Sequence, residues 1–271
     1  MDALIKYKKI VAVFATIAWL AFTFSAFRGF HFWYAGFVFF LWLALGLLNY
    51  NQNSSFWFFK NRLVAFLKFY SVLVVTAFVA DWIMGQQLAN LWSYPHYDSL
   101  DDWLRLYFII YPFGGLAILE LAYFLSGIFS EKLSFVQKPY TNIHWLVDKL
   151  DVGLLFLIFA ATLLAVGGIL KGYTSFMVYG FLVWTVFGTW KLKYHISHWS
   201  HYIYILVATL FMSVFLHELP NVGTFEWKYN TAPMLNQEVL GIPLWVILGW
   251  YILVLGMVRL WIFLVLKPGQ K

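Results

Sequence analysis

The sequence predicts an all-α fold, a polytopic membrane helix bundle of about eight transmembrane helices arranged as two parallel four-helix repeats. Three observations predict it. The 271 residues are 63% hydrophobic and only 11% charged, which is more apolar surface than one soluble core can bury. The apolar residues fall into eight long runs separated by polar links, and motifs of the first half return in the same order in the second.

The runs approach the length of roughly 20 residues that a helix needs to cross a bilayer core. The first, over 10–27, follows Lys6, Lys8 and Lys9, and because no small-residue cleavage site follows it we expect an uncleaved first helix. The other predicted spans cover 32–48, 63–84, 103–129, 152–170, 173–190, 202–216 and 239–266. The predicted domains are a first repeat over 1–130, a basic linker over 131–150 and a second repeat over 151–271.

The positive charges predict the orientation of the bundle. Four helices per half make the two repeats parallel, related by an axis along the membrane normal. With eight spans, the N-terminal lysines and nine further basic residues fall on one side: Lys60, Arg62, Lys132, Lys138, Lys149, Lys191, Lys193, Lys267 and Lys271. By the positive-inside rule this side is the cytoplasm, so we predict a cell-membrane protein with both termini cytoplasmic and its acidic links outside.

Composition excludes several functional classes. The net charge of +6 is spread over short links, which favours topology signalling over nucleic-acid binding. Cysteine is absent, so disulfides, thiolate metal sites and cysteine nucleophiles are excluded. No Ser-His-Asp arrangement, phosphate-cradling glycine loop or nucleotide-binding fingerprint is present. We expect no cofactor, and membrane lipid or an isoprenoid is the expected partner.

His195, His198 and His201 have the spacing that places imidazoles on one broad helix face, as a metal site requires. His217, however, lies sixteen residues beyond His201, so at about 1.5 Å per residue the two are near opposite membrane faces. The chain also has fewer histidines than the His-box membrane oxygenases use. We therefore predict no metal site and interpret the three as an interfacial cluster in contact with lipid phosphate.

The duplicated motifs lie around the third and fourth predicted helices of each half. Each copy has a helix ending in an acid (Asp81, Glu218), a Trp-x-Tyr link and a following helix that opens near a proline. The link residues are Trp92, Tyr94, Trp227 and Tyr229, and the prolines are Pro112 and Pro243. Because the motif occurs twice, we expect a site at the seam between the halves.

Glu120 is a carboxylate deep inside an apolar helix, which is costly and therefore a functional-site hypothesis. Pro112 and Gly114-Gly115 predict a kink upstream of it. Burial would keep this carboxyl protonated and able to donate a proton. The alternative is an uncharged Glu120 that serves as a structural hydrogen-bond donor to a neighbouring helix. A pairing with Arg259 has no support, and that arginine is expected to reach the headgroups.

Asp81 and Glu218 leave two alternatives open. They form a coupled pair across the pseudo-axis, or they are interfacial residues with their carboxylates in water. The aromatic content of 23% likewise fits either internal packing or the lining of a site for a long, flat, apolar ligand.

The acid, the Trp-x-Tyr link and the helix opening near a proline make the chain resemble the membrane lycopene cyclase domain family, carotenoid-ring-forming proteins built from two related multi-helix halves. That family carries Pro-Leu-Glu-Glu where this chain has Pro112-Phe113-Gly114-Gly115 and Pro243-Leu244-Trp245. The resemblance implies an intramolecular lyase or isomerase performing redox-neutral, proton-initiated cyclisation of an isoprenoid end group, with Glu120 as acid and Asp81 or Glu218 as auxiliary acid or base. A small proton-coupled transporter and a non-catalytic lipid-binding factor are the alternatives.

Overall fold

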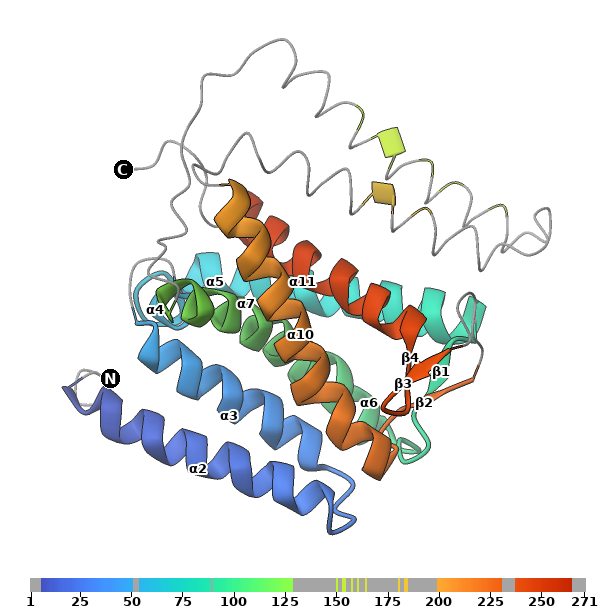
Figure 1. The fold of residues 1–271 in the computed structure, drawn as a ribbon, viewed down its shortest axis with the longest axis horizontal. Coiled ribbons are helices and arrows are strands. Elements are labelled where there is room, and N and C mark those ends of the chain that lie inside the picture. Colours follow the sequence, from blue (N-terminus) through green and yellow to red (C-terminus); the bar gives the residue numbers. More distant parts are fainter. Residues whose placement is uncertain are drawn as a thin grey trace.

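The computed structural model describes residues 6–50, 54–88, 90–128, 199–230 and 237–264, together with isolated positions between 150 and 184 (Figure 1). These residues are mostly helical, as predicted. The spans predicted over 152–170 and 173–190, apart from those isolated positions, lie outside the described residues. So do the basic linker, the C-terminal lysines, His195 and His198, and the side chains of His201 and Arg259.

The first half forms an ordered series of helices. Four of them match the predicted spans: α2 (Lys8–Ala26), α3 (Trp33–Leu48), α5 (Leu63–Ala77) and α7 (Tyr111–Ile128). The sequence did not predict the short helix α4 (Ser55–Asn61). The segments η1 (Phe78–Leu88) and η2 (Leu106–Ile110) continue the spans predicted over 63–84 and 103–129, but their π-helical form was not predicted. Helix α6 (Leu100–Arg105) begins with a capping box between Ser99 and Asp102.

The second half contributes α10 (Trp199–Thr224) and α11 (Leu244–Leu264). Four two-residue strands lie in the links: β1 (Trp92–Ser93), β2 (Lys228–Tyr229), β3 (Glu238–Val239) and β4 (Ile242–Pro243). β1 pairs with β2 and β3 with β4, both antiparallel. All four strands lie at the same end of the bundle (Figure 1).

Within the described part of the chain, three helical segments are long and apolar enough to cross a membrane: Lys8–Ala26, Leu63–Gln87 and Leu100–Leu125. In α2 the side chains of Ile10, Phe14 and Phe24 are more than half exposed, which suits contact with lipid. These features identify a helical membrane protein.

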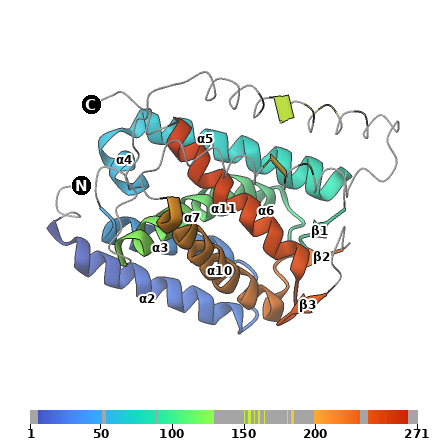
Figure 2. The same ribbon diagram turned by 45° about the horizontal axis from the view of Figure 1, so that its top comes forward.

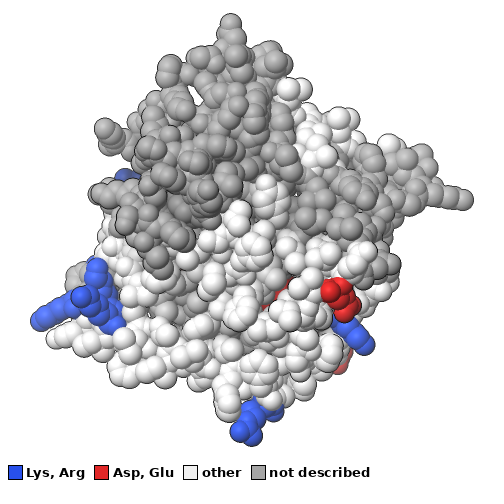
Figure 3. All heavy atoms as spheres, viewed as in Figure 1, with Lys and Arg blue, Asp and Glu red and all other residues white. Residues whose placement is uncertain are grey.

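The described acidic residues lie both inside the bundle, as Glu120 on α7 does, and in the links at the strand end, as Glu238 in β3 does. The described part of the face in Figure 3 is largely uncharged, with its visible charges near the margins. The start of α2 and helix α4, which carry Lys8 and Lys60, lie at the end opposite the strands (Figures 1 and 2). Lys228 lies in β2, so positive charge is also present at the strand end, and the cytoplasmic position of the termini stays a prediction.

Helix α7 is the centre of the described bundle. It contacts α3, α4, α5, α10 and α11, and every residue from Leu116 to Ala122 is buried. A helix that is apolar on all sides is expected in such a position because no face has to meet water. The π-helical segment η2 lies directly before Pro112, which has no N–H to donate to the carbonyl of Phe108. The hydroxyl of Tyr70 donates to that carbonyl instead, and the predicted kink stays a prediction.

Glu120 is fully buried on α7, and its carboxylate holds α4 in place. Oε1 accepts hydrogen bonds from the backbone N–H and hydroxyl of Ser55, both at 2.6 Å, and from the hydroxyl of Ser54 at 3.0 Å. Oε2 accepts from Asn49 at 2.9 Å. A negative group at the first turn of α4 also complements its helix dipole. Glu120 thus contacts a neighbouring helix, as the structural alternative expects, but its carboxyl oxygens accept hydrogen bonds where that alternative has Glu120 as the donor.

Replacing Gly46 with alanine tests this connection. A Cβ at Gly46 would lie 2.8 Å from the Cβ of Phe56 and 3.8 Å from Cδ of Glu120, and a rotamer change cannot move a Cβ atom. We expect Gly46→Ala to destabilise the protein by about 1–3 kcal/mol, the usual cost of overpacking. The measurement is thermal unfolding in detergent.

Gly256→Ala on α11 is the matched control, since a Cβ there meets nothing within 4 Å. It should leave the unfolding temperature unchanged or raise it slightly, because alanine favours a helix. Equal unfolding temperatures for Gly46→Ala and Gly256→Ala would contradict the packing argument.

Candidate functional site

Strands β1 and β2 join the two Trp-x-Tyr links to each other. Trp92 pairs with Tyr229, and Ser93 pairs with Lys228. In this antiparallel register each link presents its tryptophan beside the tyrosine of the other link. The seam predicted from the duplicated motif is therefore a physical contact between the two halves.

The first link surrounds Asp81, which is 2% exposed. Its carboxylate accepts hydrogen bonds from the indole of Trp92 and from the hydroxyls of Tyr94 and Tyr111 on Oδ1. Gln86 at 2.6 Å and Tyr107 at 2.8 Å donate to Oδ2. A buried carboxylate needs such donors, because without them its desolvation would be severe.

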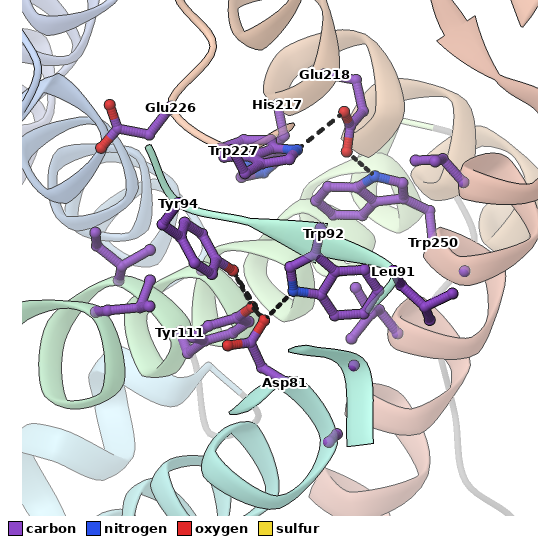
Figure 4. Close-up of a pocket in the computed structure, with 18 of the residues that line it drawn as sticks. Asp81, Leu91, Trp92, Tyr94, Tyr111, His217, Glu218, Glu226, Trp227 and Trp250 are labelled. Atoms are coloured by element: carbon purple, nitrogen blue, oxygen red, sulfur yellow. Dashed lines mark hydrogen bonds between the residues drawn. The ribbon is translucent and has the colours of Figure 1, made fainter. Parts of the chain in front are cut away.

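The second link surrounds Glu218, also 2% exposed, in the same way. Tyr229 donates to the carboxylate at 2.8 Å, Trp227 at 3.4 Å and Trp250 at 2.7 Å. Figure 4 shows the two acids on opposite sides of the paired links, each with a tryptophan of its own copy pointing at it. Each acid is thus held by the Trp and Tyr of its own motif.

Both acids line one cavity of about 320 Å³. Six aromatic side chains of the links and of α11 contribute to its wall: Trp92, Tyr94, Trp227, Tyr229, Trp245 and Trp250. Residues of α7, including Gly114, Gly115 and Ile118, line another part of it. The site is therefore a mainly apolar chamber, rich in aromatic side chains and with carboxylates in its wall, at the lower end of the usual size of ligand cavities.

The two links also start alike. Asn90 and Phe225 each lie two residues before the tryptophan, and both have a left-handed backbone, with φ of 46° and 51°. Asparagine adopts this conformation readily, but phenylalanine rarely does, so Phe225 is a strained position of the kind found at functional sites. Asn221 fixes the strained link by accepting from the backbone N–H of Trp227 and donating to its carbonyl, both at 3.0 Å.

The acids do not end their helices, which corrects the prediction. Asp81 is followed by the rest of η1, and Glu218 by six more residues of α10 up to Thr224. Asp81 precedes Trp92 by eleven residues, whereas Glu218 precedes Trp227 by nine. Because the π-helical η1 has more residues per turn than an α-helix, it accommodates the additional residues of the first copy. The alternative of water-exposed carboxylates is wrong, because both acids are buried.

Of the predicted site residues, the structure brings together Asp81, Glu218 and the four Trp-x-Tyr residues. The other three do not line the cavity. Glu120 faces α4, Pro112 lies in the first turn of α7, and Pro243 lies in β4 paired with Glu238. A role for these three in binding or catalysis stays a prediction without a contact to the chamber.

Sequence reasoning missed several cavity residues that contribute polar groups. Tyr34 and His217 share a hydrogen bond of 2.6 Å between the hydroxyl and Nδ1. Tyr111 and His217 lie inside the duplicated motifs, so the motifs could have identified them. Tyr34 on α3 is far from the motifs in sequence, and Trp250 lies on α11 after the second motif, so no sequence signal identified either residue.

Glu226 is a third acid of the cavity wall, 1% exposed and directly before Trp227 in the link. Tyr97 donates to its Oε1 at 2.6 Å. Burial raises the pKa of Glu226 to about 7, although the hydrogen bond from Tyr97 and the charge of Arg105 lower it. This carboxyl therefore changes its protonation state near neutral pH.

The raised pKa of Glu226 predicts a pH-dependent stability. Glu226 binds its proton more tightly in the folded state than in the unfolded state, where the pKa of a glutamate is near 4.5. The contribution of the protonated Glu226 to the stability of the fold is therefore complete below about pH 4.5 and is lost as the pH rises through about 7. We expect the unfolding temperature of the wild type, relative to Glu226→Gln, to fall over this window. Thermal unfolding in detergent at pH 4.5 to 8 measures it.

Glu238→Gln is the control, because Glu238 is an exposed acid in the next part of the same link. Its pH profile should follow the wild type. A profile for Glu226→Gln that is parallel to the wild type across the window would contradict the assignment.

Comparisons with known proteins leave the family open. No protein-family model matches the chain, and neither a curated protein nor a solved structure does. The function therefore has to be argued from the chemistry of the chamber itself.

Proposed function

We propose that this protein is a membrane enzyme of the lycopene cyclase type, which binds an isoprenoid end group in the aromatic chamber and cyclises it without a net redox change. The observation that carries the proposal is the pair of acid, Trp and Tyr clusters facing one cavity across the β1–β2 contact. The resemblance of the duplicated motifs to the lycopene cyclase domain family supports the same substrate class.

Glu218 is the acid in this mechanism. Its protonated carboxyl adds a proton to the terminal double bond, and the neighbouring double bond attacks the resulting cation to close the ring. Its hydrogen-bond donors are Tyr229, Trp227 and Trp250, fewer than surround Asp81. A carboxyl with fewer donors is the better candidate to carry a proton itself.

Asp81 is the base. Five side chains donate to it, which favours the carboxylate form. It removes one proton from the ring cation, so that one proton enters, one leaves and the product is an isomer of the substrate. The aromatic faces of the chamber stabilise the cation, and exclusion of water prevents hydration from ending the reaction.

The size and polarity of the chamber favour this enzyme over the alternatives. About 320 Å³ accommodates an end group but not a whole carotenoid-length chain, so the remainder of the substrate would extend into the bilayer. A proton-coupled carrier needs a polar path through the bundle, and the wall of the chamber is mainly apolar. We further infer eight spans in two parallel repeats, in the cell membrane, with both termini cytoplasmic.

Co-expression with lycopene tests the proposal. We expect the wild type to yield a cyclic isomer, and Asp81→Asn or Glu218→Gln to lower its formation by about 10²-fold or more, the usual contribution of a general acid or base. Extracted carotenoids are measured by chromatography and mass spectrometry. Glu238→Gln, which alters an exposed acid of the same link, should retain wild-type conversion.

Two glycines of α11 give a matched test of the chamber. Gly249 lines the cavity and Gly256 does not, and a Cβ at either meets nothing within 4 Å. Gly249→Leu should fill the chamber and abolish conversion, whereas Gly256→Leu should preserve it. Linear lycopene alone from the folded wild type, or equal conversion by both glycine variants, would overturn the proposal.

A further inference from the structure

The proposed reaction leaves the two acids in the wrong protonation states after each turnover. Glu218 has lost a proton, and Asp81 has gained one. Among the described residues, no hydrogen bond between side chains connects the cluster of donors around Asp81 with that around Glu218. The next turnover therefore requires protons to be exchanged with water, through a wall that is mainly apolar.

Glu226 is the third carboxyl of that wall, and the mechanism above does not use it. It lies on the link after α10, outside the membrane-spanning helices. Figure 4 shows it apart from the other two acids, with its carboxyl directed away from Trp227. Oε1 accepts from Tyr97, whereas Oε2 is buried and has no hydrogen-bond partner among the described residues.

Glu226 interacts with partly exposed charged residues on one side and with tyrosines that line the cavity on the other. On the outer side, Arg105 and Asp102 of α6 interact with it electrostatically, and the Arg105 side chain is 29% exposed. On the inner side, Tyr97 and Tyr34 also line the cavity, and Tyr34 is hydrogen-bonded to His217 beside Glu218. Tyr34 also interacts electrostatically with both Glu226 and Glu218. Glu226 thus stands between partly exposed charges and the chamber.

We propose that Glu226 is the residue through which the chamber exchanges protons with water. Oε2 takes a proton from hydronium in the water at the side of Arg105 and releases it toward Glu218, which regenerates the carboxylate of Glu226. In the opposite direction the proton that Asp81 gained leaves through Glu226 to water, so the exchange consumes and releases one proton per turnover. The raised pKa of Glu226 suits this role, because a relay works best when its pKa is near the working pH. The inference rests on the proposed cyclisation and adds to it the route of the proton.

The first test compares one turnover with many, using purified protein with lycopene in detergent. In the first turnover Glu218 donates the proton that it already carries. A relay through Glu226 is needed only afterwards, to protonate Glu218 again. In Glu226→Gln we expect the single-turnover rate to stay at the wild-type value and the steady-state rate to fall by about 10²-fold. Glu226→Asp should recover part of the loss, and Glu238→Gln should match the wild type in both rates.

The same samples in D₂O follow the proton directly. Wild-type product should carry one deuterium per ring formed, because Glu218 equilibrates with the solvent between turnovers. Brief transfer of Glu226→Gln from H₂O into D₂O should give a first product without deuterium. Wild-type deuterium content in that first product would contradict the relay.

Infrared spectroscopy gives a readout that needs no turnover. The wild type and Glu238→Gln should show a protonated-carboxyl band with a contribution from Glu226 that disappears as the pH rises through about 7, and Glu226→Gln should lack that contribution while keeping the one from protonated Glu218. A wild-type band intensity at every pH in Glu226→Gln, unchanged steady-state turnover, or equal slowing of single and repeated turnovers would overturn the relay while leaving the cyclisation intact. A folded wild type without any cyclic product would instead overturn the cyclisation, and the relay with it.

Discussion

The antiparallel contact between β1 and β2 is the interaction on which the site depends. It is only two residues long in each strand, yet it sets the links of the two halves side by side. Because the side chains of a strand alternate, pairing Trp92 with Tyr229 fixes which aromatic group of each link lies beside the other link. A shift of the β1–β2 register by one residue would turn the Trp and Tyr side chains of both links away from Asp81 and Glu218, and the cavity would lose its aromatic wall.

The buried carboxylates explain why the links are so rich in tryptophan and tyrosine. A charge in an apolar interior requires donors, and an indole N–H or a phenol O–H provides one at the end of a large apolar ring. The same residues therefore satisfy Asp81 and Glu218 and form the wall of the cavity. Aromatic side chains with these two roles suit a site that stabilises a carbocation. They also give the aromatic residues of the links a role beyond internal packing.

The structure separates two kinds of buried acid. Glu120 meets backbone N–H groups and short hydroxyls at the start of α4, so it works as a helix cap inside the bundle. Asp81, Glu218 and Glu226 meet long aromatic donors around open space. The position of Glu120 deep in an apolar helix made it the strongest candidate from the sequence. A carboxyl group must also reach a cavity to meet a ligand, and its position along a helix does not show whether it does.

The sequence by itself determined the membrane-helix fold, the positions of the spans within the described residues and the motif shared by the two halves, because hydropathy and repetition are local properties. It also marked Asp81, Glu218 and the four aromatic residues of the links. Only the tertiary structure decided that the links pair, that Glu120 faces α4 and that Tyr34, Trp250 and Glu226 join the chamber. Those contacts are set by packing between elements distant in the chain, such as α3 with α7 and α10 with α11, which no single segment encodes.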